Sequence, residues 1–330
     1  MSRSLPSKKE FIDGILSGNR MLLSRAITLI ESTKKEHYEL AQEIVEGCLP
    51  HAGNSIRIGI TGVPGVGKST FIEAFGNHVI QEEDRSLAVL AVDPSSSRTK
   101  GSILGDKTRM DTLSNNPKAY IRPTPTSGSL GGVAQSTRET ITLCEAAGFD
   151  TILIETVGVG QSETAVHSMV DFFLLLMLAG AGDELQGIKR GIMEMADAIA
   201  INKADTGNEN AAKHAMSEYK NALHLFPPTE SGWIPKVTTC SAYHNKGIVD
   251  VWDIIEEYIR HTKTKGHFDN KRKQQAVYWL EESINQELHR RFYQNKDLKR
   301  MLQSYREQVQ KGEVSTQKAA SILIENFFNK

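Results

Sequence analysis

Nine consecutive residues carry a pattern that binds nucleotide phosphates: Gly62, Val63, Pro64, Gly65, Val66, Gly67, Lys68, Ser69 and Thr70. They fit G-x-x-x-x-G-K-[ST], the P-loop. The glycines allow successive backbone N–H groups to turn toward phosphate oxygens. Lys68 supplies a positive charge for the β- and γ-phosphates, and Ser69 supplies a hydroxyl group for Mg²⁺. A glycine-rich turn with a chance lysine is the alternative. It is disfavoured because an expected strand precedes the motif and an expected helix follows it.

A second motif predicts which base is bound. Asn202, Lys203, Ala204 and Asp205 fit N-K-x-D after an expected strand. A carboxylate at Asp205 can accept two hydrogen bonds from the N1–H and N2–H₂ groups of guanine. Adenine offers no such pair of donors, so binding it would leave the carboxylate unpaired. The Lys203 stem can cover the face of the base. An N-cap role for Asp205 is the alternative.

A short segment further along the chain supports guanine independently. Ser241 and Ala242 follow Cys240 at the end of another expected strand. A loop at this place can direct the Ala242 backbone N–H to guanine O6. The two motifs together therefore predict a guanine nucleotide, GTP or GDP, rather than an adenine nucleotide.

An apolar strand over 151–155 ends in an acid that we expect near the metal. The carboxylate of Glu155 can reach the Mg²⁺ shell directly or through water. Gly158 can offer its N–H to the γ-phosphate, so that loss of the phosphate releases the following segment. Val159 occupies the position where many GTPases place a water-orienting glutamine, which predicts slow intrinsic hydrolysis. Gln161 is a candidate replacement.

Two further acids and one loop complete the candidate site. We expect Asp106 to approach Mg²⁺, and Asp93 to orient the attacking water or a water bound to Mg²⁺. The alternative for both residues is an ordinary structural role in a turn or as a helix cap. The glycine-hinged loop over 180–191 is expected either to move and contact a partner or simply to join a strand to a helix.

The elements that must position these residues alternate between strand and helix from residue 56 onward. This alternation predicts an α/β fold with a mostly parallel sheet flanked by helices, as in P-loop NTPases. Such sheets bind ligands at the carboxyl ends of their strands, where each of the motifs lies. The expected strands cover 56–60, 87–92, 120–122, 151–155, 172–178, 198–202 and 236–240.

Helical stretches flank this core on both sides. Apolar residues recur at helical spacing over 8–48, with a break at Gly18 and Asn19. Helices are also expected near 249–261, 270–291, 296–311 and 316–328, with a linker over 263–267. We therefore expect three parts: a helical extension over 1–55, a nucleotide-binding core over 56–262, and a helical arm over 263–330. The arm has an apolar stripe that packs either on the chain's own core or on a second copy.

The composition is that of an ordinary globular protein. Lysine and arginine total 39 against 40 acids, which gives a formal net charge of −1 and no support for nucleic-acid or membrane binding. Three distant cysteines indicate a reducing compartment. The most apolar run, 172–178, is too short to span a bilayer. The expectation is a cytoplasmic protein, or an organelle-matrix protein after processing.

Several of these segments together resemble one family. The segments 62–70, 92–96, 101–110, 155–163 and 202–205 are similar to those of the MeaB/ArgK family, the methylmalonyl-CoA mutase-associated GTPases. The resemblance covers nearly the whole chain, and the segment 102–110 is specific to that family. It implies a homodimeric GTPase that chaperones a cobalamin-dependent acyl-CoA mutase. In that role it gates adenosylcobalamin loading and protects or reactivates the mutase. It further implies that the region of Glu184 reads the partner and that the C-terminal helices form the dimer.

Two other functions stay open at this point. Some family members carry an older label as an ATPase or kinase of lysine/arginine/ornithine transport, although the guanine motif argues against ATP. A nucleotide-dependent scaffold with negligible catalysis is also possible, since Val159 replaces the usual glutamine. Nucleotide preference separates the GTPase from the kinase, and multiple-turnover phosphate release separates it from the scaffold.

Overall fold

The structure is a computed structural model. It describes residues 5–32, 34–92, 110–123, 130–156, 162–180, 190–205 and 207–329. Among the predicted site residues, Asp93, Asp106, Gly158 and Gln161 lie outside this part of the chain, as does most of the loop over 180–191. No helix in the described residues combines the length and the apolar character needed to cross a membrane.

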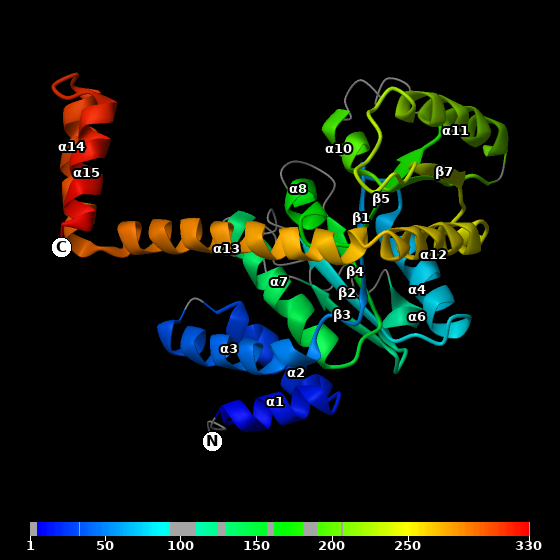
Figure 1. The fold of residues 1–330 in the computed structure, drawn as a ribbon, viewed down its shortest axis with the longest axis horizontal. Coiled ribbons are helices and arrows are strands. Elements are labelled where there is room, and N and C mark those ends of the chain that lie inside the picture. Colours follow the sequence, from blue (N-terminus) through cyan, green and yellow to red (C-terminus); the bar gives the residue numbers. More distant parts are fainter. Residues whose placement is uncertain are drawn as a thin grey trace. The chain divides into compact units, whose positions relative to one another are not determined.

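A seven-stranded parallel sheet forms the centre of the fold (Figure 1). The strand order is β3-β2-β4-β1-β5-β6-β7, and every neighbouring pair is parallel. Each strand expected from the sequence is present, with its ends displaced by at most two residues, so the predicted fold class is confirmed. The strands are β1 Ile56–Gly62, β2 Leu87–Val92, β3 Ala119–Pro123, β4 Thr151–Thr156, β5 Phe172–Leu178, β6 Ala198–Asn202 and β7 Lys236–Thr239.

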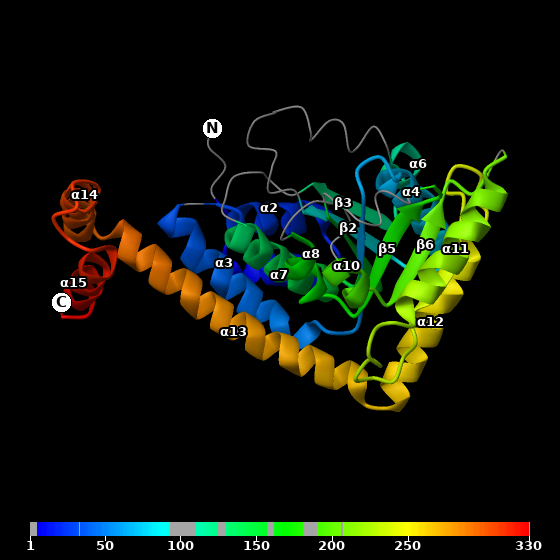
Figure 2. The ribbon, with the colours of Figure 1, turned by 90° about the horizontal axis from the view of Figure 1, so that it is seen from above.

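Helices cover both faces of the sheet (Figure 2). On one face lie α4 Lys68–Gln81 and α12 Ile248–Thr264, with the one-turn α6 Asp111–Ser114 beside α4. On the other lie α7 Leu130–Ala146, α8 Ser162–His167, α10 Arg190–Met195 and α11 Glu209–Leu223. Strand residues alternate between the two layers. Leu174 and Leu176 of β5 pack toward α4 and α12, whereas Leu175 and Met177 pack toward α10 and α11. Both faces are buried, which explains the continuous apolar run of β5.

The N-terminal extension is helical, as expected. It consists of α1 Lys8–Leu16, α2 Arg20–Ile30 and α3 Lys35–Cys48, followed by the 3-10 turn η1 Leu49–His51. The break between α1 and α2 falls at the predicted place. Gly18 adopts a φ of +74°, and the Asn19 side chain accepts hydrogen bonds from the first backbone N–H groups of α2. These helices pack against one another and against α7.

The prediction of a linker over residues 263–267 is wrong in its extent. Helix α12 continues to Thr264, and only Lys265 and Gly266 separate it from α13 His267–Gln294. The φ of +69° at Gly266 turns the chain within this short space. The remaining helices, α14 Lys296–Gln310 and α15 Thr316–Phe328, agree with their predicted ranges.

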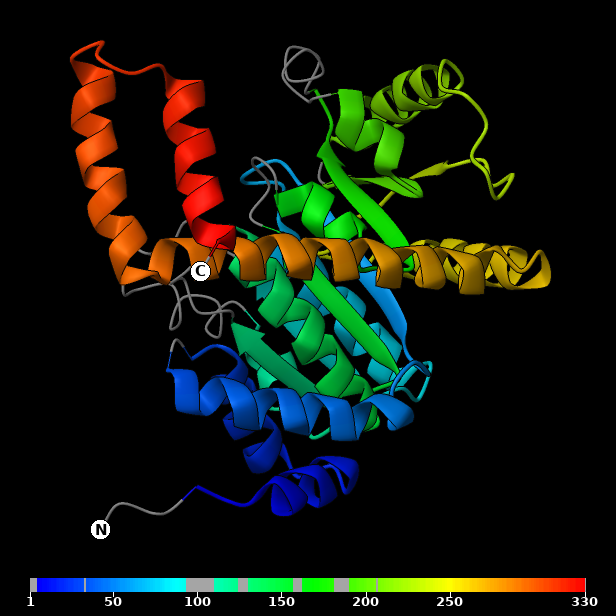
Figure 3. The ribbon, with the colours of Figure 1, turned by 60° about the vertical axis from the view of Figure 1, so that its left-hand side comes forward.

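The chain divides into two compact units, Met1–Gln275 and Ala276–Lys330. In the first unit, the base of α13 is fixed to the core by Arg272. Its guanidinium donates to both carboxylate oxygens of Asp171 and to the Ser55 carbonyl, and the Asp171 side chain is almost fully buried. In the second unit, α14 and α15 lie side by side as a helical hairpin (Figure 3).

Candidate nucleotide-binding site

The P-loop lies at the carboxyl end of the central strand. β1 ends at Gly62, with β4 on one side of it and β5 on the other, and α4 begins at Lys68. Strand, loop and helix therefore follow one another as the motif requires. The backbone N–H groups at the start of α4 have no partner in the helix itself, so they are available to phosphate oxygens.

Two of the loop glycines are required by the backbone. Gly62 has a φ of +153°, and a Cβ atom there would lie 2.4 Å from the Leu176 carbonyl oxygen. Gly67 is the N-cap of α4 with a φ of +93°, a left-handed conformation that side chains disfavour. Any larger residue at Gly62 would push β1 away from β5. Close packing against β5 thus explains the glycine at position 62, and the left-handed backbone explains the glycine at position 67.

Lys68 is held over the loop. Its ammonium donates to the Gly62 carbonyl at 2.8 Å and to the Val63 carbonyl at 3.4 Å. Burial lowers the pKa of Lys68, while the negative charges of Glu155 and Glu163 act in the opposite direction. The side chain is therefore placed at the mouth of the loop, where it can reach phosphate oxygens.

Two of the residues expected to hold magnesium, Ser69 and Glu155, lie in the described part of the chain and are in contact. The Ser69 hydroxyl donates to a carboxylate oxygen of Glu155 at 3.5 Å. Glu155 is next to last in β4 and pairs in register with Ile60 of β1. A hydroxyl and a carboxylate in contact are hard oxygen ligands of the kind that Mg²⁺ prefers. The donor set present in the described residues thus fits this ion.

The guanine motif is tied directly to the P-loop. Asn202 is buried at the end of β6, and its amide donates to the Val66 carbonyl at 2.9 Å. Lys203 adopts a φ of +59°, and its ammonium donates to the Gly65 carbonyl at 2.8 Å. One segment therefore supports the phosphate loop from the side on which the base would lie.

The second guanine segment is joined to the first. The Ser241 hydroxyl donates to the carboxylate of Asp205. The backbone N–H of Ala242 donates to the side-chain oxygen of Asn202 at 3.1 Å. A contact from Ala242 to guanine O6 would have to share or replace this bond. All the predicted base-binding residues in the described part of the chain lie together at the carboxyl ends of β6 and β7.

One buried acid beside this site had no role in the sequence-based prediction. Glu163 lies in the first turn of α8 and is only 1% exposed. Its neighbours in sequence, Ser162 and Thr164, are polar, so no local pattern indicates burial. The bridging role of Asn202 was missed as well, because it depends on contacts with residues 66 and 242, far away in the sequence.

A P-loop on a parallel sheet, joined to an N-K-x-D segment, defines a P-loop GTPase. Within that class, the chain belongs to the MeaB family. The family described as "Methylmalonyl Co-A mutase-associated GTPase MeaB" matches residues 23–297. The enzymatic class follows from family membership, and the chain is a GTPase.

Relatives from several organisms support this assignment. A probable GTPase of Mycobacterium tuberculosis is 49% identical over 318 residues, which cover 95% of this chain and 94% of the relative. GTPase ArgK of Escherichia coli is 46% identical over 291 residues, 88% of each chain. The mitochondrial methylmalonic aciduria type A homolog of Mus musculus is 43% identical over 334 residues, covering 97% and 80%. Among solved structures, an LAO/AO transport system kinase has a TM-score of 0.77 at 37% identity, covering 99% of this chain and all of that one.

Proposed function

We propose that this GTPase is a chaperone of a cobalamin-dependent acyl-CoA mutase of the methylmalonyl-CoA mutase type. It binds and hydrolyses GTP, gates adenosylcobalamin loading, and protects or reactivates the mutase. The observation that carries the nucleotide part is the Asp205 carboxylate, which lies beside Ser241 in a segment anchored to the P-loop by Asn202. The mutase part is supported by the family description and by the name of the mouse relative.

In this proposal each group in the site has a distinct task. Lys68 and the backbone N–H groups of residues 65–70 hold the phosphates, and Ser69 and Glu155 hold Mg²⁺. The ion neutralises charge on the phosphate oxygens when it is bound. Asp106 is proposed as a further metal contact, and Asp93 and Gln161 as groups that orient water. Gly158 would sense the γ-phosphate. Because Val159 replaces the usual glutamine, intrinsic turnover is expected to be slow.

A kinase acting in basic amino-acid transport is the second candidate function. It is favoured only by the description of one similar solved structure as a transport system kinase. The chemistry of Asp205 opposes it, because adenine has no pair of donors for that carboxylate. Recognition of guanine therefore remains the better account of the base-binding part of the site.

Multiple-turnover phosphate release from GTP and from ATP tests the proposal. The full chain should hydrolyse GTP at least about 100-fold more efficiently than ATP, since a buried carboxylate left unpaired opposes adenine. Addition of apo-methylmalonyl-CoA mutase should raise the rate, and GTP should change adenosylcobalamin loading followed by absorbance. Preference for ATP, with phosphate transferred to a basic amino-acid binding protein, would support the kinase. Nucleotide-dependent mutase binding without phosphate release would support a scaffold.

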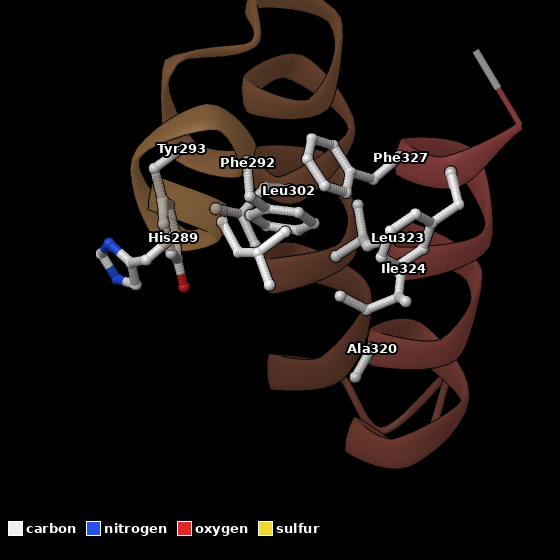
Figure 4. A pocket seen from close by; sticks show the side chains of 10 residues that line it. His289, Phe292, Tyr293, Leu302, Ala320, Leu323, Ile324 and Phe327 are labelled. Atoms are coloured by element: carbon white, nitrogen blue, oxygen red, sulfur yellow. The ribbon is translucent and has the colours of Figure 1, made fainter. Parts of the chain in front are cut away.

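We also propose that the C-terminal helices form a homodimer. In the unit Ala276–Lys330, four apolar residues at helical spacing on α13 are between 42% and 60% exposed. They are Val277, Leu280, Ile284 and Leu288. Leu288 also lines an apolar groove of about 400 Å³ between α13, α14 and α15 (Figure 4). Phe292 and Phe327 meet in this groove, with ring centroids 5.5 Å apart. The four residues, called the apolar stripe here, share Leu288 with the groove, and exposed apolar surface of this kind favours a second copy as its partner.

Placing two acids on this stripe should give a monomer. Charges buried in an apolar interface without partners oppose association strongly. The double variant Leu280→Asp with Ile284→Asp should therefore halve the mass measured by light scattering after size exclusion. A matched control, Gln303→Asp with Ser304→Asp, adds two acids at exposed polar positions of α14 and should keep the dimer. A wild-type chain that is monomeric at micromolar concentration would contradict the proposal.

A further inference from the structure

Glu163 is a buried carboxylate with incomplete hydrogen bonding. One oxygen, Oε2, accepts from the hydroxyl of the adjacent Ser162 at 3.3 Å, a long distance for such a bond. The other, Oε1, is buried and has no hydrogen-bond partner within the described residues. Burying a charge in this way costs folding free energy, so packing alone does not account for an acid at this position.

The position of Glu163 relates it to the phosphate site. It follows β4 by seven residues, and β4 carries Glu155 near its carboxyl end. Helix α8 packs on β1 and β4, and Val166 lies against Gly59 of β1, three residues before the end of that strand. The first turn of α8 therefore lies on the same edge of the sheet as the P-loop.

Within the described residues, Lys68 is near more than one negative charge. Two carboxylates, Glu155 and Glu163, act on the ammonium of Lys68. Glu155 contacts Ser69, so it belongs to the candidate metal site. Glu163 is the additional negative charge. It attracts cations and repels the oxygens of a nucleotide phosphate.

We propose that Glu163 makes nucleotide binding depend on Mg²⁺. In the absence of nucleotide it is a counter-charge to Lys68. When a nucleotide arrives alone, the carboxylate opposes the phosphates, and when Mg²⁺ accompanies the nucleotide and neutralises two of its charges, the carboxylate opposes the complex less. The inference rests on the proposed function, in which guanine nucleotides bind together with Mg²⁺. It adds that Glu163 is one cause of this Mg²⁺ dependence. Glu163 is a positioning and selectivity residue here, and no direct contact with the nucleotide is required.

The test compares GDP affinity with and without the ion. Fluorescently labelled GDP is titrated into the full chain in excess Mg²⁺ and in excess EDTA, and the ratio of the two Kd values measures the dependence. Glu163→Gln should bind GDP more tightly than wild type in EDTA. The ratio should fall by about tenfold, the order expected for one unit charge about 12 Å from the charge that it opposes, at an effective dielectric constant of about 20. Glu163→Asp keeps the charge and should keep most of the ratio.

Two further measurements make the result decisive. Glu139→Gln makes the same chemical change at a carboxylate of α7 that hydrogen-bonds Gln42 and Gln135, and it should leave the ratio unchanged. A thermal melt of the nucleotide-free Glu163→Gln chain should show one cooperative transition, which establishes that the variant is folded when its GDP affinity is measured. An unchanged ratio in the folded Glu163→Gln chain would overturn the inference.

Failure of this inference can be told apart from failure of the proposed function. A wild-type chain that binds no GDP in either buffer would refute the guanine-nucleotide function itself. A wild-type chain that binds GDP with Mg²⁺ dependence, together with an unchanged ratio in Glu163→Gln, would refute only the role of Glu163. GDP binding with no Mg²⁺ dependence in wild type would also refute that role.

Discussion

Replacing Asp205 with asparagine should weaken GDP binding by about 100-fold or more. The carboxylate is expected to accept two hydrogen bonds from guanine, and hydrogen bonds to charged groups contribute about 1.5–3 kcal/mol each. An amide can accept only through its oxygen, and its NH₂ group would face the guanine donors. A loss of about 3–4 kcal/mol corresponds to about 100- to 1,000-fold in Kd. Titration with labelled GDP in excess Mg²⁺ measures the effect.

The same variant offers a gain-of-binding control. Xanthine carries a carbonyl oxygen where guanine has its N2 amino group, so the asparagine NH₂ group becomes a suitable donor. Asp205→Asn should therefore prefer xanthosine diphosphate over GDP, whereas wild type should prefer GDP. The Ser241 hydroxyl can still donate to the new side chain, so the fold should be retained. GDP affinity within about threefold of wild type would refute the guanine pocket at this place.

Replacing Lys68 with alanine should lower GTP turnover by about 1,000-fold. The ammonium lies over the loop, bonded to the Gly62 and Val63 carbonyls, and the proposed mechanism transfers it to the phosphates. Removing one preorganised donor from such a site typically costs about 100- to 1,000-fold, and this donor also carries a charge. Single-turnover phosphate release separates the chemical step from nucleotide binding.

A matched lysine shows whether the effect is local. Lys118 is an exposed lysine near the start of β3 that pairs with Asp84, and Lys118→Ala should keep wild-type turnover. The Tm of Lys68→Ala without nucleotide should stay close to that of wild type. The Gly62 and Val63 carbonyls lose their bonds to Lys68 in this variant, but they can accept hydrogen bonds from water instead. Retention of more than about a tenth of the GTP turnover in Lys68→Ala would contradict a catalytic role for this lysine.

Most of the fold could be predicted from the sequence, because each element has a local signal. The strands of the sheet read as apolar runs between turns, and both faces of β5 are buried as its unbroken run indicates. The break between α1 and α2 was predicted from Gly18 and Asn19. In the structure, Gly18 has a positive φ that ends α1, and the Asn19 side chain caps the start of α2. The linker was misjudged because Lys263 and Thr264 have no helix-breaking feature, and only Gly266 ends the helix.

The sequence by itself determined the chemistry of the P-loop and of the guanine motif. In both, the groups that must meet the ligand come from a few adjacent residues, so spacing alone specifies them. Only the tertiary structure decided how these motifs act together. Asn202 joins Val66 to Ala242, and Glu163 is buried beside the P-loop although its sequence neighbours are polar. Burial and such bonds depend on segments 40 or more residues apart being folded against each other, and no local pattern encodes that proximity.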